Sequence, residues 1–335
     1  MYLLPALNLR PHWAVKLIAQ RCLAQAPILL LVAFGSFALL RIAPGDFLSE
    51  LSADPQVAPA TLAALRARYG LDQPFLLQFG QWLSHAVRGD LGYSLAYHTP
   101  VSTLIGERIA NTVWLALAGL LLALCAALFT GVFSLRWPWL ERALTVAASL
   151  LLATPSFVLA LVALLWAART GLAPLGGVSS LESAALAPSA QFADFLRHVW
   201  LPASVLALRQ FPAYFLQLRA SMHESLQADY ILTARAKGLN ETRVLGKHAL
   251  KNALPALIVQ VGNSLGALLS GAFIVETVMS WPGLGSLAVS ALLSRDVYVL
   301  LGCLLYAALL LALGNLLADL WLQALDPRTR NQSHA

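Results

Sequence analysis

One pentapeptide in the chain has the residue types of a hydrolytic nucleophile. The run Gly262-Asn-Ser264-Leu-Gly266 matches the G-x-S-x-G pattern, in which a strained strand-to-helix turn presents a serine to a histidine base. Here the pattern lies inside an apolar stretch with helical length, and none of the seven histidines falls within a predicted membrane span. An intramembrane serine hydrolase using Ser264 is therefore the weaker alternative. Ser264→Ala would abolish such an enzyme and would barely affect a transporter.

Other patterns that could bind a metal ion or a nucleotide are incomplete. His223-Glu224 begins like the H-E-x-x-H zinc motif, but Gln227 stands where the second histidine is required. No G-x-x-x-x-G-K-[ST] nucleotide-binding loop occurs in the sequence. Three cysteines without CxxC spacing lie in or beside apolar stretches and are predicted to be packing residues: Cys22, Cys125 and Cys303. We expect no catalytic residue, no metal site and no cofactor on this chain.

The composition places the elements that carry these residues in a membrane. Of the 335 residues, 59% are hydrophobic and only 11% are charged, which is far from the balance of a soluble domain. The net charge of +6 does not indicate nucleic-acid binding, because the cations lie mainly at the ends of apolar stretches. Because a span needs about 20 apolar residues, the sequence predicts an all-α membrane protein with about six transmembrane helices. The six windows are Arg21–Arg41, Arg108–Arg136, Arg142–Arg169, Val199–Leu218, Pro255–Thr277 and Val297–Leu317.

The distribution of cations predicts the orientation of these spans. With the amino terminus inside, thirteen Lys and Arg lie on the cytoplasmic side and eight on the outer side. Both termini are therefore placed in the cytoplasm. The predicted organisation is an interfacial segment (1–22), a first span (23–41), an external loop with short helices (42–110), a core with spans two to six (111–325) and a cytoplasmic tail (326–335).

Two local patterns refine this arrangement. In the external loop, Thr61 to Tyr69 and Gln73 to Val87 have helical spacing, so the loop is predicted to be partly helical. Pro155 interrupts the third span and predicts a kink there, which is either a hinge or only a feature of shape.

A polar, basic segment, residues 219–255, separates the fourth and fifth spans. Within it, Gln227 to Lys237 is predicted to be a short amphipathic helix, with Leu226, Tyr230 and Ala234 in one apolar row. Gly238 is expected to end this helix and Asn240 to cap the next one. Arg243, Lys247 and Lys251 form a basic stripe that needs no function beyond contact with lipid headgroups. The small residues Ala234, Ala236 and Gly238 instead suggest close packing against a partner.

Within the spans, glycines and charges are the remaining candidates. Gly262, Gly266 and Gly271 lie in the fifth span and are predicted to let another helix approach closely. Arg209 in the fourth span and Glu276 near the outer end of the fifth are possible pathway residues, because intramembrane charges usually face the protein interior. The alternatives are that Arg209 pairs with a carbonyl or a partner subunit and that Glu276 caps a loop.

The polar segment also resembles a known family. YILTARAKGLN (230–240) followed by KHALKNALP (247–255) is similar to the "EAA" loop of ABC importer permeases, in the form found in dipeptide, oligopeptide and nickel permeases. Asp229-Tyr230 stands in place of the Glu that names the loop, and Phe47 stands where the family often has Pro. Further blocks resemble the family in its order: RIAPGD (41–46), YGLDQPFLLQFGQWL (69–83), RGDLGYS (88–94), SWPGLGSL (280–287), SRDVY (294–298) and LDPRTR (325–330).

This resemblance implies a non-catalytic permease subunit in a bacterial inner membrane. Its expected partners are a second, homologous permease subunit, two subunits that bind ATP and Mg²⁺, an external solute-binding protein and membrane lipid. The expected cargo is a di- or oligopeptide, with nickel or another small solute as the alternative; a receptor or scaffold without transport is a third possibility. The residues that would couple to the ATPases are Asp229, Tyr230, Thr233, Ala234, Arg235, Ala236, Lys237, Gly238 and Leu239.

Overall fold

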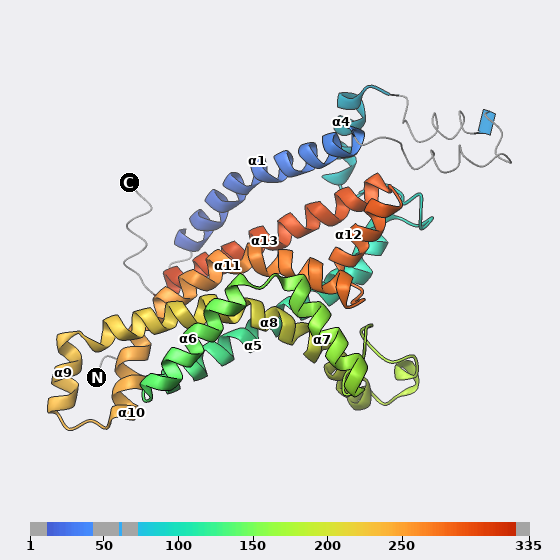
Figure 1. The fold of residues 1–335 in the computed structure, drawn as a ribbon. Helices are drawn as coiled ribbons and strands as arrows, with labels where there is room; N and C mark the ends of the chain where they lie inside the picture. The colour runs from blue at the N-terminus through green and yellow to red at the C-terminus, as the bar shows by residue number, and fades with distance from the viewer. Residues whose placement is uncertain (1–11, 43–59, 62–72, 326–335) are drawn as a thin grey trace.

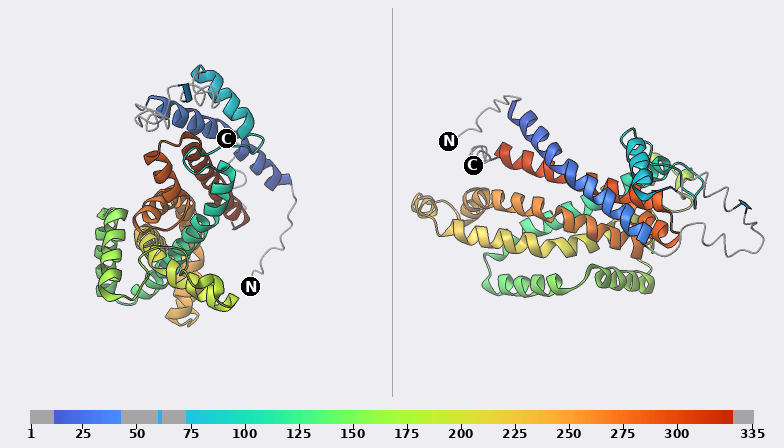
Figure 2. Two further views of the ribbon diagram at one scale, coloured as in Figure 1. Left: turned by 90° about the vertical axis from the view of Figure 1, so that its right-hand side faces the viewer. Right: turned by 90° about the horizontal axis from the view of Figure 1, so that it is seen from above.

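The described part of the chain is a bundle of helices that run mostly along one long axis (Figures 1 and 2). The computed structural model describes residues 12–42, 60–61 and 73–325. Within these residues the only β-type pairing is an isolated bridge between Tyr93 and Pro100. The first elements are α1 (His12–Ile42), α4 (Phe75–Ala86), α5 (Val101–Ser134), α6 (Pro138–Ala153), α7 (Ser156–Thr170) and η1 (Ser183–Ala185). They are followed by α8 (Pro188–Leu226), α9 (Asp229–Ala236), α10 (Glu241–Arg243), the π-helix η2 (Val244–Ala249), α11 (Leu250–Val278), α12 (Leu284–Leu293) and α13 (Val297–Leu325).

The long apolar helices agree with a protein that crosses the membrane several times. Four segments are long and apolar enough to span it, and α6 with α7 would make a fifth: the four are Leu17–Ala38, Val101–Ser134, Glu241–Val278 and Val297–Leu320. The expected fourth span lies within α8, which has 39 residues but is less apolar than these four. The expected second span begins earlier than predicted, because the run from Val101 is continuous with it in α5.

The expected third span is not one straight helix. It is divided into α6 and α7, and the chain bends by 105° between the two helices. Thr154 and Pro155 both have extended backbone between the two helices. Pro155 has no N–H to donate and its ring disfavours the helical conformation at Thr154, so the chain breaks there. The structure therefore confirms an interruption at this proline and shows a sharper one than the predicted kink (Figure 1).

The centre of the bundle is α8, which packs along α5 and α11. Glycines in α5 allow the close contact: a Cβ at Gly119 would lie 2.7 Å from Leu206, and a Cβ at Gly131 would lie 2.7 Å from Leu218. Buried apolar side chains from these three helices belong to two core clusters, one on either part of α8. Helix α1 and the α6–α7 pair lie on different sides of this centre (Figure 2).

A third core cluster lies where α1 and α4 meet α12 and α13. Phe37 packs edge-on against Phe75 and Phe79 and lies beside Trp82, so aromatic rings fasten α4 to α1. Helix α4 confirms the helix predicted over Gln73 to Val87. The other predicted helix in this loop, Thr61 to Tyr69, lies outside the described residues except for Thr61.

Candidate functional site

Helix α9 lies at one end of the bundle, where it connects α8 to α10 (Figure 1). It runs from Asp229 to Ala236, slightly shorter than the predicted helix. Asp229 occupies the first turn, where a carboxylate is favourable for the helix dipole. Gly238 follows with φ +74°, a left-handed conformation that glycine adopts without strain, and the chain turns there as predicted.

The face that α9 presents differs from the predicted one. Ile231 is fully buried and Ala234 is 4% exposed, and both belong to the core cluster formed with α8 and α11. Tyr230 and Leu232 are 40% and 61% exposed. The predicted apolar row through Tyr230 and Ala234 is therefore wrong, because one of its members faces outward and the other faces inward. Ala234 packs within its own chain, while Ala236 remains exposed.

Polar contacts hold the turn between α9 and α10. Arg235 donates a 2.7 Å hydrogen bond from Nη2 to Oε1 of Glu241, and this bond and the carboxylate charge raise the pKa of the Arg235 guanidinium. Asn240 caps α10 as predicted, since its Oδ1 accepts a 3.2 Å hydrogen bond from the Thr242 amide. Arg136, after α5, donates to Thr242 Oγ1 at 2.7 Å. The turn is thus connected both to α9 and to the end of α5.

The predicted basic stripe follows this turn on an unusual helix. Val244–Ala249 is a π-helix, so the ideal i, i+4, i+8 spacing of the stripe does not hold along it. Arg243, Lys247 and Lys251 are nevertheless exposed, and Val244 and Leu245 are buried. The arrangement agrees with cations at a surface and apolar side chains in the core.

A cluster that the sequence did not indicate connects α6 to the end of α8 near α9. Glu141 in α6 accepts hydrogen bonds from Arg219 Nε and, at 2.6 Å, lies against His223 Nε2. These contacts join residues 78 and 82 positions apart. The three residue types are ordinary for the positive-inside loop, so only the fold shows that they meet.

Glu276 is fully buried near the C-terminal end of α11. Its Oε2 accepts a 2.6 Å hydrogen bond from the amide of Gly285 at the start of α12, and a Cβ at Gly283 would lie 2.3 Å from its Cδ. A carboxylate at a helix N-terminus is electrostatically favourable. The contact agrees with the alternative in which Glu276 caps a neighbouring segment, here the start of α12. Its carboxylate does not face an open surface.

Arg209 lies within α8 and is partly exposed. Within the described residues it has no hydrogen-bond or ion-pair partner, so its role in a pathway stays a prediction.

The three glycines of α11 face two different helices. A Cβ at Gly262 would lie 3.0 Å from Ala318 of α13, and one at Gly266 would lie 3.7 Å from Leu311 of the same helix. Gly271 instead faces Leu206 of α8, at 3.5 Å. Gly262 therefore marks a close helix approach, whereas the other two positions have ordinary contact distances.

Ser264 is a structural residue of α11. It is in the interior of the helix, where its hydroxyl donates a 2.9 Å hydrogen bond to the carbonyl of Val261 and lies 2.7 Å from the Tyr214 hydroxyl. A nucleophile elbow requires a strand-to-helix turn, which is not present at this position. The cysteines also differ from the prediction, since Cys303 is buried but Cys22 and Cys125 are exposed.

Comparisons with known proteins cover nearly the whole chain. Residues 118–331 match the family described as binding-protein-dependent transport system inner membrane component, and residues 14–116 match the N-terminal region of such membrane components. The chain is 36% identical over 315 residues to the oligopeptide transport system permease protein AppB of Bacillus subtilis, covering 93% of this chain and 98% of AppB. It is 32% identical over 316 residues to the glutathione transport system permease protein GsiC of Salmonella choleraesuis, covering 93% and 98% of the two chains.

Proposed function

This chain belongs to the family of binding-protein-dependent transport system inner membrane components, and on that premise we propose that it carries di- or oligopeptides across the membrane. It is a multi-pass permease subunit of an ABC importer and is itself non-catalytic, because ATP hydrolysis in such systems resides in separate subunits. The observation that carries the choice of cargo is the similarity along nearly the full chain to a permease named for oligopeptide transport. Nickel is the alternative cargo, and neither AppB nor GsiC is named for it.

The coupling element of this permease is α9 with the turn at Gly238. The buried side of α9 consists of Ile231 and Ala234. Its exposed side carries Tyr230 and Leu232, which are large apolar groups beside charged residues. Such a side is suited to a groove on an ATPase subunit. The contacts at Glu241 and Thr242 would transmit movement of α9 to α10 and to the end of α5.

The remaining partners follow from the same assignment. A second, homologous permease would complete the pathway, two ATP-binding subunits would dock at the end of the bundle that carries α9, and an external binding protein would deliver cargo at the opposite end. The start of α1, the end of α13 and α9 all lie at the same end of the molecule (Figure 1). Cytoplasmic ATPases at α9 would therefore place both termini of the described bundle in the cytoplasm.

The experiment is to purify the tagged protein with its companions and to reconstitute the complex in vesicles. We expect a second permease and a nucleotide-binding subunit to co-purify, and we expect ATP-dependent uptake of a labelled peptide that excess Ni²⁺ does not inhibit. Uptake of ⁶³Ni²⁺ without peptide uptake would assign the cargo to the alternative. Co-purification without uptake of any solute would support the scaffold function instead.

A further inference from the structure

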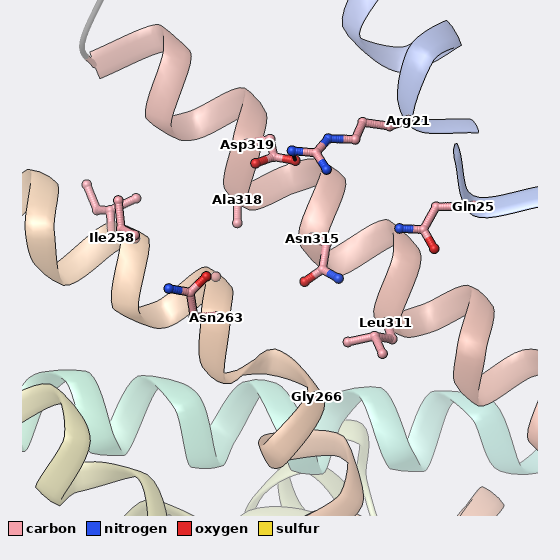
Figure 3. A pocket seen from close by; sticks show the side chains of 11 residues that line it. Arg21, Gln25, Ile258, Asn263, Gly266, Leu311, Asn315, Ala318 and Asp319 are labelled. Atoms are coloured by element: carbon pink, nitrogen blue, oxygen red, sulfur yellow. Dashed lines mark ion pairs between the residues drawn. The ribbon is translucent and has the colours of Figure 1, made fainter. Parts of the chain in front are cut away.

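A polar cavity lies between α1, α11 and α13 (Figure 3). Its volume is about 450 Å³, which is within the range of cavities that hold small organic ligands. Eleven residues line it, and five of them are polar: Arg21, Gln25, Asn263, Asn315 and Asp319. The two ionisable side chains belong to apolar segments with the length of membrane spans, Leu17–Ala38 and Val297–Leu320. Arg21 and Asp319 lie near the ends of these segments, where a charged group is tolerated when it faces protein, water or a ligand.

The charges of the cavity are paired but accessible. Arg21 Nη2 lies 2.8 Å from Asp319 Oδ2, and the two side chains are 47% and 26% exposed. The pair has one positive and one negative member and is partly open to a ligand. A ligand with both charges can replace each partner, so neither Arg21 nor Asp319 is left as an unpaired charge. A ligand with one carboxylate and one ammonium group would satisfy both.

Two asparagine side chains of the cavity have hydrogen-bonding groups that a ligand could use. Asn263 on α11 and Asn315 on α13 project into the space between the two helices (Figure 3). Neither side chain has a hydrogen-bond partner within residues 12–42, 60–61 and 73–325. Each carboxamide can donate two hydrogen bonds and accept two, which matches the alternating N–H and C=O groups of a peptide backbone. These unused groups point to a ligand with peptide bonds rather than to a simple ion.

We propose that this cavity is a binding site for a short zwitterionic peptide, in which Arg21 holds the terminal carboxylate and Asp319 the terminal ammonium group. The inference rests on the proposed function and locates one cargo site in the half of the bundle nearer α9. A peptide bound there separates the ion pair, and its release toward the cytoplasm lets the pair re-form. A zwitterionic lipid headgroup presents the same two charges without peptide bonds, and the test distinguishes the two.

The test uses the complete importer in inside-out vesicles without nucleotide. Cys22 and Cys125, the exposed cysteines, are replaced by serine, and Asn315→Cys or Asn263→Cys is introduced. Lys251→Cys serves as the control, because Lys251 is exposed near the start of α11, the helix that carries Asn263, and does not line the cavity. The rate of labelling by a charged, membrane-impermeant maleimide is measured alone, with a free dipeptide, and with the same dipeptide acetylated and amidated at its ends.

We expect the cavity cysteine to react and the free dipeptide to slow its labelling several-fold, whereas the blocked dipeptide has no effect and the Lys251→Cys variant is labelled equally fast with and without either dipeptide. The proposal is overturned if neither cavity cysteine reacts or if free and blocked dipeptides act alike. It is also overturned in favour of a headgroup if labelling depends only on whether the vesicles contain phosphatidylethanolamine. ATP-dependent peptide uptake by the serine-substituted parent is measured in parallel, so that failure of the proposed function is recognised separately.

Discussion

Ser94 donates a 2.7 Å hydrogen bond to Asp296, a residue 202 positions later in the chain. The same carboxylate accepts from the amide of Ala96 at 3.1 Å and from the amide of Val299 in the first turn of α13 at 3.3 Å. Asp296 thus caps α13 and anchors the loop that leads into α5. It is 1% exposed, so the groups that it satisfies have little access to water.

Asp296→Ala should therefore lower the stability of the complex. It leaves Ser94 and two amides without their acceptor, a change that typically costs about 1–3 kcal/mol. Asp90→Ala is the control, because Asp90 is exposed and accepts one hydrogen bond, from the amide of Gly92; we expect its effect to be within about 0.5 kcal/mol. Thermal unfolding of the purified complex measures both, and equal melting temperatures for the two variants would contradict the anchoring role.

Gly238→Ala should impair the coupling of ATP hydrolysis to uptake. Gly238 has φ +74° and open space around its Cα, so the substitution introduces backbone strain of about 1–2 kcal/mol without a clash. Gly246→Ala is matched in size and surroundings, since a Cβ there also meets nothing within 4 Å and its φ is not positive. The number of peptides taken up per ATP hydrolysed should fall for the first variant only.

Substitutions at two neighbouring residues of α9 should affect ATPase docking and protein stability separately. Leu232→Ala removes an exposed apolar group and should reduce co-purification of the ATPase subunit while the melting temperature stays unchanged. Ile231→Ala creates a cavity in a buried position and should destabilise the permease by about 2–5 kcal/mol. If Leu232→Ala retained the ATPase fully, the outer side of α9 would not be the docking surface.

Gly285→Ala and Gly106→Ala should change stability in opposite directions. A Cβ at Gly285 would lie 2.4 Å from the Phe273 Cα, so α12 would have to move away from α11. Such overpacking typically costs about 1–3 kcal/mol. Gly106 is an exposed position of α5 with nothing within 4 Å, where alanine should stabilise the helix by up to about 1 kcal/mol. Protease resistance in membranes and melting temperature both report the difference.

The local features of the site were predictable because they depend on a few adjacent residues. Gly238 at the end of α9, Asn240 as a cap and the break at Pro155 all follow from the backbone chemistry of single residues. The buried face of α9 did not follow. On a helix of eight residues, the rows through Tyr230 and through Ile231 are both partly apolar, and only the position of α8 and α11 decides between them.

Contacts between distant segments were not predictable from one sequence. Glu141 with Arg219, and Arg21 with Asp319, are pairs whose members lie on different helices. Each residue alone is typical of the end of a membrane span, so spacing along the chain gives no indication of its partner. The polar cavity was missed for the same reason, although Gly262 in its wall was predicted to be a packing residue.

The break at Pro155 has a consequence for the surroundings of the protein. At about 1.5 Å per residue, α6 and α7 are about 24 and 22 Å long, so neither crosses about 30 Å of hydrocarbon alone. Leu152 and Phe157, on either side of the break, are 43% and 49% exposed. Lipid tails cannot hydrogen-bond to irregular backbone, so this corner of the molecule needs water or another protein chain beside it. Lipid alone therefore cannot surround this face of the protein.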